Sequence, residues 1–406
     1  MKQFFATIAA LILLAGCQGH VEKDYNLVQV ANGLEFEDIY TLEAEGSVTI
    51  GLDEQTGFYQ GSVFYKELDG QKIYSFINRL NNSVYWYDLA TQQRIKRIDL
   101  AVEGPNGVGS MQVADHVIDD EGNLIIYNVN SGLLMRVDQE GKVLKRISVF
   151  DIEGETEASF PNPSSTRKMV LVDNTVYIPC EILRRKTSYS DITALLKVDL
   201  ETGEANYQMN YPEAYDLGHW GAIFKFQPSL AYNPDTKNFV VNFPVDPNLH
   251  VVNTDGDKLS KTYVGSKYIK RFAPLTSDVK YGVRMDPNKR DMRSYEYSLT
   301  SSDYSSIVYD RQNKVYYRYV ANRPSKEQFQ VGNKAPEYSL IILNEDLTKL
   351  GEIRLDKTQY YASMSVVTPE GIVIPRLDLY GQNEDVMVFD ILKLKTVGDA
   401  LAYNND

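Results

Sequence analysis

The sequence predicts an all-β fold, a six-bladed β-propeller of four-stranded antiparallel blades, and three observations support it. Short runs that alternate between apolar and polar residues dominate the 406-residue chain, and Gly, Asn or Asp bounds most of them. Residues 70–100 and 122–149 superpose as strand, polar loop, strand, turn and strand. In both segments the middle strand ends in an apolar residue followed by Asp, and this step recurs along the chain. Successive strands that pair through short turns form a meander, which is the unit of a propeller blade.

The apolar-Asp or apolar-Asn step sets the predicted number of blades. It occurs six times, at Tyr87-Asp88, Val137-Asp138, Val198-Asp199, Val252-Asn253, Leu343-Asn344 and Phe389-Asp390. The intervals are 50, 61, 54, 91 and 46 residues, and blade repeats are roughly 40–50 residues long. The longest interval equals two ordinary ones, so seven blades are the alternative. Residues 254–303 fall within it, and their weak alternation and many charges favour a long insertion. A β-sandwich fits the near-regular spacing less well.

The last predicted blade lacks an outer strand of its own. After Asp390 the sequence has no Gly turn, only the short run 392–396 and a polar tail. Residues 35–51 end in an alternating run that could complete this blade, close the ring and remove an exposed sheet edge. We therefore assign residues 35–406 to a single propeller domain that is closed by its N-terminal strand.

Residues 1–16 are typical of the signal peptide of a lipoprotein. Lys2 gives a positive start, and the apolar run at 4–15 suits a signal-peptide core. That run is shorter than the about 20 residues that span a bilayer. It ends in Leu-Ala-Gly-Cys at 14–17, which resembles a bacterial lipobox, so we expect cleavage before Cys17 and a lipid on its thiol. A plain secretory signal or a buried helix is the alternative interpretation.

Cleavage and acylation at Cys17 would place the protein in the cell envelope. Residues 17–34 would then be a polar tether, and the acylated Cys17 would be the contact with the membrane, held stably by several acyl chains. Gln18 rather than Asp follows the cysteine. Under the enterobacterial sorting rule, this favours the outer membrane and leaves the periplasmic and the surface-exposed face as alternatives.

Charge and composition exclude several classes of function. The chain has 42 basic and 55 acidic residues and a net charge of −13, whereas nonspecific nucleic-acid binding needs a basic surface, so we expect no nucleic-acid partner. Only four His and two Cys are present, which argues against zinc, haem and cysteine-nucleophile chemistry. With Cys17 acylated, Cys180 has no cysteine partner, and we expect it to be a small buried hydrophobic residue.

The chain also resembles a known group of proteins. The lipobox, the chain length, the phrase Val-Glu-Gly-Pro-Asn-Gly at 102–107 and the Asp-x-x-Gly turns are similar to those of six-bladed propeller lipoproteins of the Bacteroidota. Within that set the resemblance is to the domain-of-unknown-function group 4221, beside TolB-like and NHL-like propellers. It covers nearly the whole mature chain and implies the propeller fold. The group carries no established activity, so the resemblance implies no catalytic residues.

Candidate ligand-binding residues come from the ends of the second strands and from the connector at 217–220. In a propeller, the loops between second and third strands share one face with the blade connectors, and ligands usually bind there, at the mouth of the channel. The candidates are Arg79, Asn128, Glu181, Arg184, Asn242, Arg318, Arg376, His219 and Trp220. Arginines there could clamp a carboxylate or sulfate, whereas amides and tyrosine faces would suit a sugar. The alternative is that these residues cap strand-end carbonyls and pair with acidic neighbours.

The sequence carries no signature of a catalytic site, and we assign no catalytic residue and no cofactor. It has no Gly-x-Ser-x-Gly, His-Glu-x-x-His or phosphate-binding glycine loop. Our leading hypothesis is an envelope-tethered, noncatalytic binding module for a glycan, a peptide or a partner protein. One alternative is a metal-dependent hydrolase or lactonase-like enzyme with a divalent ion in the channel. Another is a scaffold subunit of an envelope complex, because the propeller fold serves all three roles.

Overall fold

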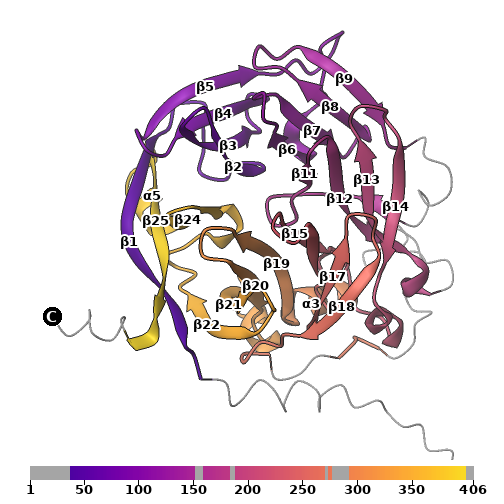
Figure 1. Ribbon diagram of the computed structural model, residues 1–406. Coiled ribbons are helices and arrows are strands. Elements are labelled where there is room, and N and C mark those ends of the chain that lie inside the picture. The colour runs from indigo at the N-terminus through magenta and orange to yellow at the C-terminus, as the bar shows by residue number, and fades with distance from the viewer. Residues whose placement is uncertain (1–36, 151–158, 183–187, 270–272, 277–291, 399–406) are drawn as a thin grey trace, which may run out of the picture.

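Six antiparallel sheets stand in a ring around a central channel (Figure 1). The computed structural model describes residues 37–150, 159–182, 188–269, 273–276 and 292–398. Five sheets have four strands, and the third has five because its innermost strand is split. The six-bladed propeller is therefore confirmed, and the seven-bladed alternative is wrong. Within the described ranges, no helix is both long enough and apolar enough to cross a membrane.

The strands follow one another from the channel outwards in each blade. Blade 1 holds β2 (Val63–Leu68), β3 (Gln71–Asn78), β4 (Ser83–Asp88) and β5 (Gln93–Asp99). Blade 2 holds β6 (Ala114–Ile118), β7 (Leu124–Asn128), β8 (Leu133–Val137) and β9 (Val143–Ser148). Blade 3 holds β10 (Ser159–Pro161), β11 (Val170–Val172), β12 (Thr175–Ile182), β13 (Thr193–Asp199) and β14 (Ala205–Asn210).

The second half of the ring repeats this order with three short helices added. Blade 4 holds β15 (Ser229–Asn233), β16 (Asn238–Asn242), β17 (Asn248–Asn253) and β18 (Lys258–Tyr263). Blade 5 holds β19 (Asp303–Asp310), β20 (Val315–Asn322), β21 (Glu337–Asn344) and β22 (Lys349–Leu355). Blade 6 holds β23 (Val366–Thr368), β24 (Gly371–Pro375), β25 (Val386–Thr396) and β1 (Tyr40–Gly51). The helices are α3 (Met292–Thr300), α4 (Lys326–Gln330) and α5 (Leu377–Tyr380).

The recurring apolar-Asp or apolar-Asn step marks the end of the third strand in the first five blades. Its polar side chain caps the turn that follows. Asp138 Oδ1 accepts hydrogen bonds from the backbone N–H groups of Glu140 and Lys142 at 3.0 and 2.8 Å. Asn253 Oδ1 does the same for Asp255 and Asp257 at 3.0 and 2.9 Å. Short polar side chains favour such turns because they satisfy backbone donors that the strands leave free.

The predicted closure of the ring by an N-terminal strand is confirmed. β1 pairs antiparallel with β25 from Tyr40 opposite Thr396 to Gly51 opposite Val386, and Figure 1 shows the indigo β1 beside the yellow β25. Ile50, which is fully buried, packs in the same cluster as Met387 and Phe389. Strands from both ends of the chain therefore complete one four-stranded sheet, and β1 covers the edge of β25 that would otherwise be unpaired.

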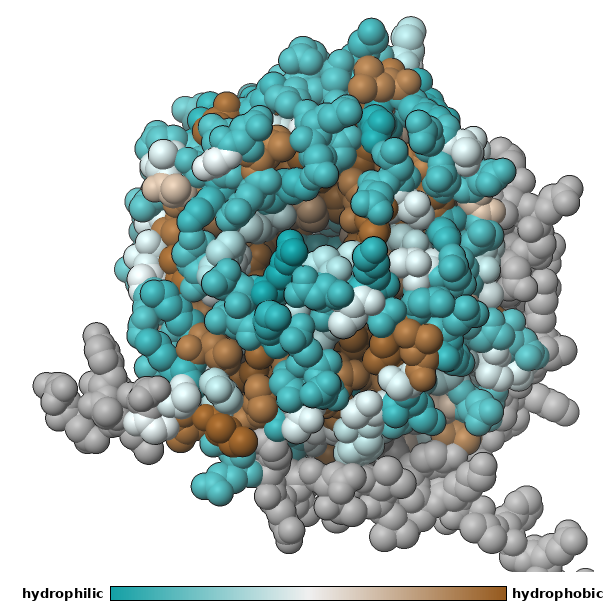
Figure 2. Space-filling view, viewed as in Figure 1, coloured by the Kyte–Doolittle hydropathy of each residue, from teal (hydrophilic) through white to brown (hydrophobic). Residues whose placement is uncertain are grey.

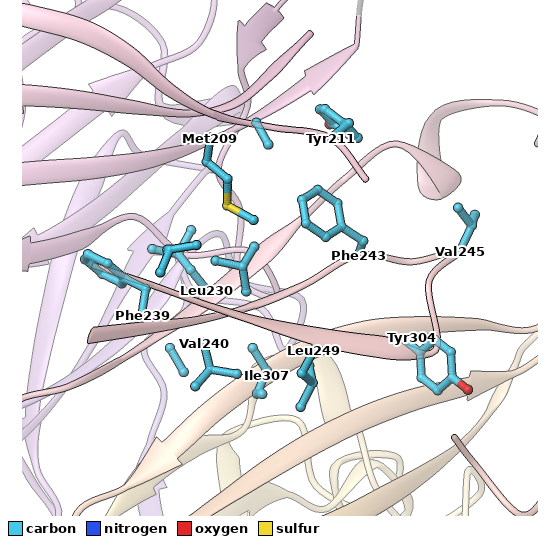
Figure 3. Close-up of a cluster of buried hydrophobic side chains, with 14 of the residues drawn as sticks. Met209, Tyr211, Leu230, Phe239, Val240, Phe243, Val245, Leu249, Tyr304 and Ile307 are labelled. Atoms are coloured by element: carbon cyan, nitrogen blue, oxygen red, sulfur yellow. The ribbon is translucent and has the colours of Figure 1, made fainter. Parts of the chain in front are cut away.

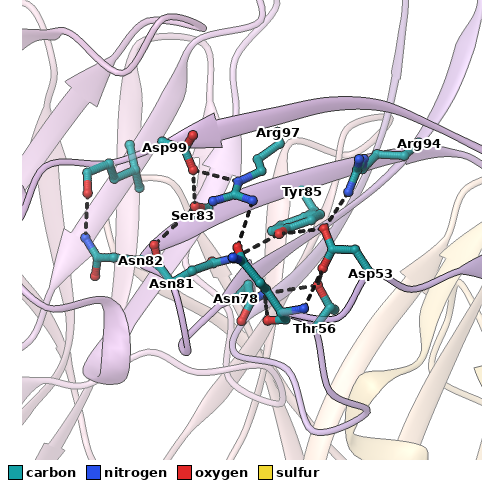
Figure 4. A network of polar contacts seen from close by, with 12 residues as sticks. Asp53, Thr56, Asn78, Asn81, Asn82, Ser83, Tyr85, Arg94, Arg97 and Asp99 are labelled. Atoms are coloured by element: carbon teal, nitrogen blue, oxygen red, sulfur yellow. Dashed lines mark hydrogen bonds and ion pairs between the residues drawn. The ribbon is translucent and has the colours of Figure 1, made fainter. Parts of the chain in front are cut away.

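After β1, a polar network fixes the chain against blade 1 (Figure 4). Asp53 accepts hydrogen bonds from Thr56 Oγ1 at 2.6 Å and from the hydroxyl of Tyr85 at 3.1 Å. Arg94 on β5 pairs with the same carboxylate at 2.6 Å. Partial burial raises the pKa of Asp53, but these hydrogen bonds outweigh it and hold that pKa below its usual value.

The predicted insertion at 254–303 is shorter than expected. Lys258–Tyr263 form β18, the outer strand of blade 4, so this part of the stretch belongs to a blade. The two lysines of this strand, Lys258 and Lys261, are exposed, as are the two residues between them. The rest of the stretch connects blades 4 and 5 and includes α3, which His219 binds through a 2.7 Å contact between Nε2 and Ser294 Oγ.

Buried tyrosines fill the seams between blades and account for much of the unusual count of 29. In the largest cluster, Tyr211 and Phe243 pack with their ring centroids 5.2 Å apart, beside Met209 and Leu230 (Figure 3). The Tyr211 hydroxyl lies 2.6 Å from the carbonyl of Cys180 in blade 3. A tyrosine thus supplies apolar contact area and one hydrogen bond to a neighbouring element, which suits a seam between sheets.

Candidate functional site

The central channel holds a cavity of about 410 Å³. All six blades line it, through the inner strands β2, β6, β11, β15 and β19 and through the segment that leads into β23. Inner strands lie closest to the axis in Figure 1. The ring face in that view is mostly hydrophilic, with apolar residues scattered over it (Figure 2). The cavity is therefore a feature of the whole ring rather than of one blade.

Small hydroxyl side chains dominate one part of the cavity wall. They come from blades 3, 4, 5 and 6 and are Ser165, Thr166, Ser229, Ser306, Ser363 and Ser365. Several are already oriented by the protein: Ser365 Oγ lies 2.8 Å from the Tyr319 hydroxyl, and Ser229 Oγ accepts from Asn242 Nδ2 at 3.1 Å. A hydroxyl both donates and accepts, so such a wall can match a polar ligand in several ways.

Lys168 lies in this wall because the inner strand of blade 3 is interrupted. β10 and β11 both pair with β12, and residues 162–169 leave the sheet between them. The segment is held in place by two contacts to other blades: Ser165 Oγ donates to the Gly61 carbonyl at 3.0 Å, and the Met169 N–H donates to Asp115 Oδ2 at 3.0 Å. Its position is therefore fixed by blades 1 and 2.

The ammonium group of Lys168 makes no hydrogen bond or ion pair with any side chain or carbonyl in the part of the chain that the structure describes. Burial lowers the pKa of Lys168 to about 8, and the nearby carboxylate of Asp115 offsets part of that effect. Below that pH the cavity wall carries an ammonium with three donors, none of which has an acceptor among the described residues.

Asp115 and His116 lie behind the wall and are fully buried. Burial raises the pKa of Asp115 to about 6, although hydrogen bonds from the Ser62 hydroxyl and from Met169 favour the charged form. His116 Nε2 lies 2.7 Å from Ser75 Oγ. Burial lowers the pKa of His116 to about 3, and the charge of Lys168 adds to the shift. His116 is therefore neutral at physiological pH.

A second group of lining residues differs in charge from the first. Lys66 is the second lysine in the lining, and its ammonium forms an ion pair with Asp120. Asp173, Tyr232 and Tyr309 complete this group. The lining thus contains two lysines. Lys66 is paired with Asp120, whereas Lys168 has no ion pair with any described residue.

The two predicted asparagines lie outside the cavity lining and hydrogen-bond to other parts of the protein. Asn128 Nδ2 donates to the carbonyls of Val108 and Ser110, both at 3.0 Å, and its Oδ1 accepts from the N–H of Asn130 at 3.1 Å. Asn242 Nδ2 donates to Ser229 Oγ and to the Tyr304 carbonyl at 2.9 Å. Both side chains are buried.

The predicted arginines have three different surroundings. Arg318 is fully buried, and its guanidinium donates to Asn242 and to three backbone carbonyls. Arg376 forms a two-bonded pair with Asp378 at 2.9 and 2.8 Å and also contacts Asp390 at 3.1 Å. Arg79 is exposed. A role of these arginines in ligand binding stays a prediction.

The remaining candidates lie around blade 3 and its connector to blade 4. Glu181 accepts from Gln227 Nε2 at 2.8 Å. His219 is bound to Ser294, and Trp220 Nε1 donates to the Ala214 carbonyl at 3.1 Å. Arg184 and the lipidation candidate Cys17 lie outside the described residues. None of the eight candidates that the structure describes lies in the cavity lining.

Sequence reasoning missed the cavity-lining segment 162–169. The available signal was the polar, proline-containing break at Pro161 and Pro163, which separates two short apolar runs where other blades have one continuous inner strand. Among described residues, no three His, Cys, Asp or Glu side chains are grouped so that they could hold a metal ion. The hydrolase and scaffold alternatives stay untested.

Comparisons with known proteins agree with the architecture. The sequence model of the family described as Domain of unknown function (DUF4221) matches residues 39–354. The crystal structure of a DUF4221 family member from Bacteroides vulgatus is similar with a TM-score of 0.75 and 23% identity, over 89% of this chain and 100% of that one. A protein of Bacteroides fragilis, named as a candidate exported protein, has a TM-score of 0.54 and 11% identity, over 88% of this chain and 96% of that one. No curated protein matches.

Proposed function

The chain belongs to the DUF4221 family of domains of unknown function, and on that premise we propose that it is an exported, lipid-tethered binding module that takes a small hydroxyl-bearing ligand, such as a mono- or disaccharide, into its central channel. The cavity of about 410 Å³ carries this proposal. Ligand sites in proteins are preformed hollows of about 300–1,000 Å³ that combine apolar walls with a few placed polar groups.

The chemistry of the wall favours a saccharide within this size range. Serine and threonine hydroxyls from four blades can exchange hydrogen bonds with sugar hydroxyls in either direction. Tyr232 and Tyr309 add aromatic faces from the second group of lining residues, and such faces pack against the apolar side of a sugar ring. These hydroxyl groups and the two tyrosines already line the cavity, so a sugar can contact them without any rearrangement of the blades.

A thermal-shift screen against neutral and acidic mono- and disaccharides tests the channel as the site. A ligand at 100 times its dissociation constant should stabilise the protein by about 2.7 kcal/mol, which moves the melting temperature measurably. Thr166→Phe places an aromatic ring in the cavity and should abolish the shift. Leu144→Phe is the matched control, because Leu144 is 49% exposed on the outer strand β9.

The outcomes of this screen separate clearly. A saccharide-dependent shift that Thr166→Phe removes and Leu144→Phe retains supports binding in the channel, provided that both variants melt as the parent does without ligand. A shift that survives Thr166→Phe places the ligand elsewhere on the ring. The absence of any shift across the panel contradicts the proposal.

The tether is a separate part of the proposal and has its own test. Leu-Ala-Gly-Cys at 14–17 supports acylation of Cys17, and the Bacteroides fragilis relative supports export. Metabolic labelling of the full chain with an alkyne fatty acid should label the protein, and fractionation should place it in the outer membrane. Cys17→Ser should abolish both, whereas Cys180→Ser should leave both unchanged. Equal labelling of the parent and Cys17→Ser contradicts lipidation at this residue.

A further inference from the structure

The cavity lining contains a charged group, the ammonium of Lys168, that has no hydrogen-bond acceptor among the described residues. The Lys168 ammonium lies in the cavity lining, between hydroxyl side chains of its own segment and those of neighbouring blades. No described residue accepts a hydrogen bond from it. A half-buried ammonium without an acceptor is costly, because burial removes water that would otherwise accept from it.

The neighbouring charges do not supply the missing acceptor. Asp115 is the carboxylate whose charge acts on Lys168. Both of its oxygens already accept hydrogen bonds, Oδ1 from the Ser62 hydroxyl and Oδ2 from the Met169 N–H. Arg167, the residue before Lys168, interacts electrostatically with Glu181 and Asp115 and donates to the Asn162 carbonyl at 3.1 Å. These acids are thus engaged by other groups, and Lys168 lies in the cavity lining without an acceptor among the described residues.

The segment that carries Lys168 is also fixed in place. Ser164 and Arg167 exchange backbone hydrogen bonds of 3.0 Å in both directions, which closes a tight turn two residues before Met169. The anchors to Gly61 and Asp115 attach that turn to blades 1 and 2. The backbone that carries Lys168 therefore loses little conformational freedom when a ligand arrives, and only the lysine side chain has to be ordered.

On the basis of the proposed function, we infer that the channel ligand is a sugar acid, and that Lys168 binds its single carboxylate while the surrounding hydroxyls bind the sugar ring. A monoanion fits better than a phosphate monoester, because Lys168 supplies one positive charge, and the carboxylates of Asp115 and Asp173 would repel a second negative charge on the ligand.

Calorimetric titration of the purified protein with four probes tests the inference. The probes are glucuronate, its neutral methyl ester, glucose and glucose 6-phosphate. Glucuronate should bind at least tenfold more tightly than its methyl ester and than glucose 6-phosphate. Lys168→Met keeps the length and apolar part of the side chain but removes the charge, and it should reduce glucuronate affinity at least tenfold with little effect on glucose.

Lys66→Met is the matched control within the same cavity. Lys66 also lines the wall, but its charge is paired with Asp120, so its removal should leave the preference for glucuronate over the methyl ester intact. The thermal melt of each variant verifies that it is folded.

The results distinguish this inference from the function on which it rests. Equal binding of glucuronate and its methyl ester, or unchanged glucuronate binding in Lys168→Met, overturns the role of Lys168. If Thr166→Phe still abolishes binding in that case, the channel remains the saccharide site. If none of the four probes binds, the inference about Lys168 fails. If the thermal-shift screen against saccharides is also negative, the proposed function fails as well.

Discussion

Arg318 on β20 donates a 2.8 Å hydrogen bond from Nε to Oδ1 of Asn242, the last residue of β16 in the preceding blade. Its other guanidinium nitrogens donate to the carbonyls of Asp246, Pro247 and Val264, all at 2.7 Å. The guanidinium also lies over the Tyr304 ring, 3.6 Å from its centroid. One buried arginine thus joins blade 4, the connector that follows it and blade 5.

We predict that Arg318→Met destabilises the protein by about 3–5 kcal/mol, because it leaves several buried acceptors without a donor. Urea denaturation measures this loss. Arg79→Met serves as the control, because Arg79 is exposed and surface substitutions usually change stability by less than about 0.5 kcal/mol. A loss below about 1 kcal/mol for Arg318→Met would contradict a structural role and return this arginine to the candidates for ligand binding.

The blade repeat could be predicted because the first five blades share the same local requirement, whereas the sixth step, Phe389-Asp390, lies inside β25. A turn must follow the third strand, and a short polar side chain such as Asp138 or Asn253 satisfies its backbone donors. That requirement is local and is therefore visible in the sequence. The closing strand was predictable for a related reason, since an outer edge at β25 without a partner would have been exposed.

The channel lining could not be predicted in the same way, because it depends on contacts between distant segments. Ser229 and Ser306 share the cavity only because blades 4 and 5 are adjacent in the ring. The break that carries Lys168 is visible in the sequence, but the direction in which it folds is set by Asp115 and Gly61. The predicted Asn128 and Asn242 do lie at strand ends, where the amide of Asn128 donates to a connector carbonyl and that of Asn242 donates to the Tyr304 carbonyl of β19.

The closing strand leads to a second prediction. Deletion of residues 21–52 should prevent folding, because it removes the whole outer strand of blade 6 and exposes the core residues Met387 and Phe389. A milder change, Ile50→Ala, should cost about 2–5 kcal/mol, as expected for a large-to-small substitution at a fully buried position. Ser47→Ala on the same strand is exposed and should be neutral. A cooperative melt of the truncated chain at the parent temperature would refute the role of β1.

Cys180 provides a third prediction. Its side chain is fully buried in the core shared by blades 2 and 3, as expected from the sequence, and burial raises the pKa of its thiol. Because the thiolate is the reactive form, an aromatic disulfide reagent should not react with Cys180 in the native protein. The thiol should react fully in strong denaturant, and the Cys180→Ala variant gives the background. Fast reaction under native conditions would mean that the seam between blades 2 and 3 opens readily.

The buried imidazole of His116 predicts a specific dependence of stability on pH. Burial lowers its pKa to about 3, from an ordinary value near 6.5. Between these values the unfolded chain binds a proton that the folded protein does not, so His116 makes the protein less stable as the pH falls from 6.5 towards 3. The slope contributed by one such group is at most ~1.4 kcal/mol per pH unit.

His116→Gln isolates this contribution, because glutamine keeps a hydrogen-bonding group near Ser75 but does not titrate. Asp115, whose pKa burial raises to about 6, acts in the opposite direction between about pH 4 and 6, and Lys168 is charged throughout. Both are present in the parent and the variant, so the difference between the two proteins reports mainly on His116. Urea unfolding at pH 7, 5.5 and 4 should show the variant gaining stability relative to the parent as the pH falls. If the stabilities of parent and variant instead change in parallel with pH, His116 takes up its proton as readily in the folded protein as in the unfolded chain.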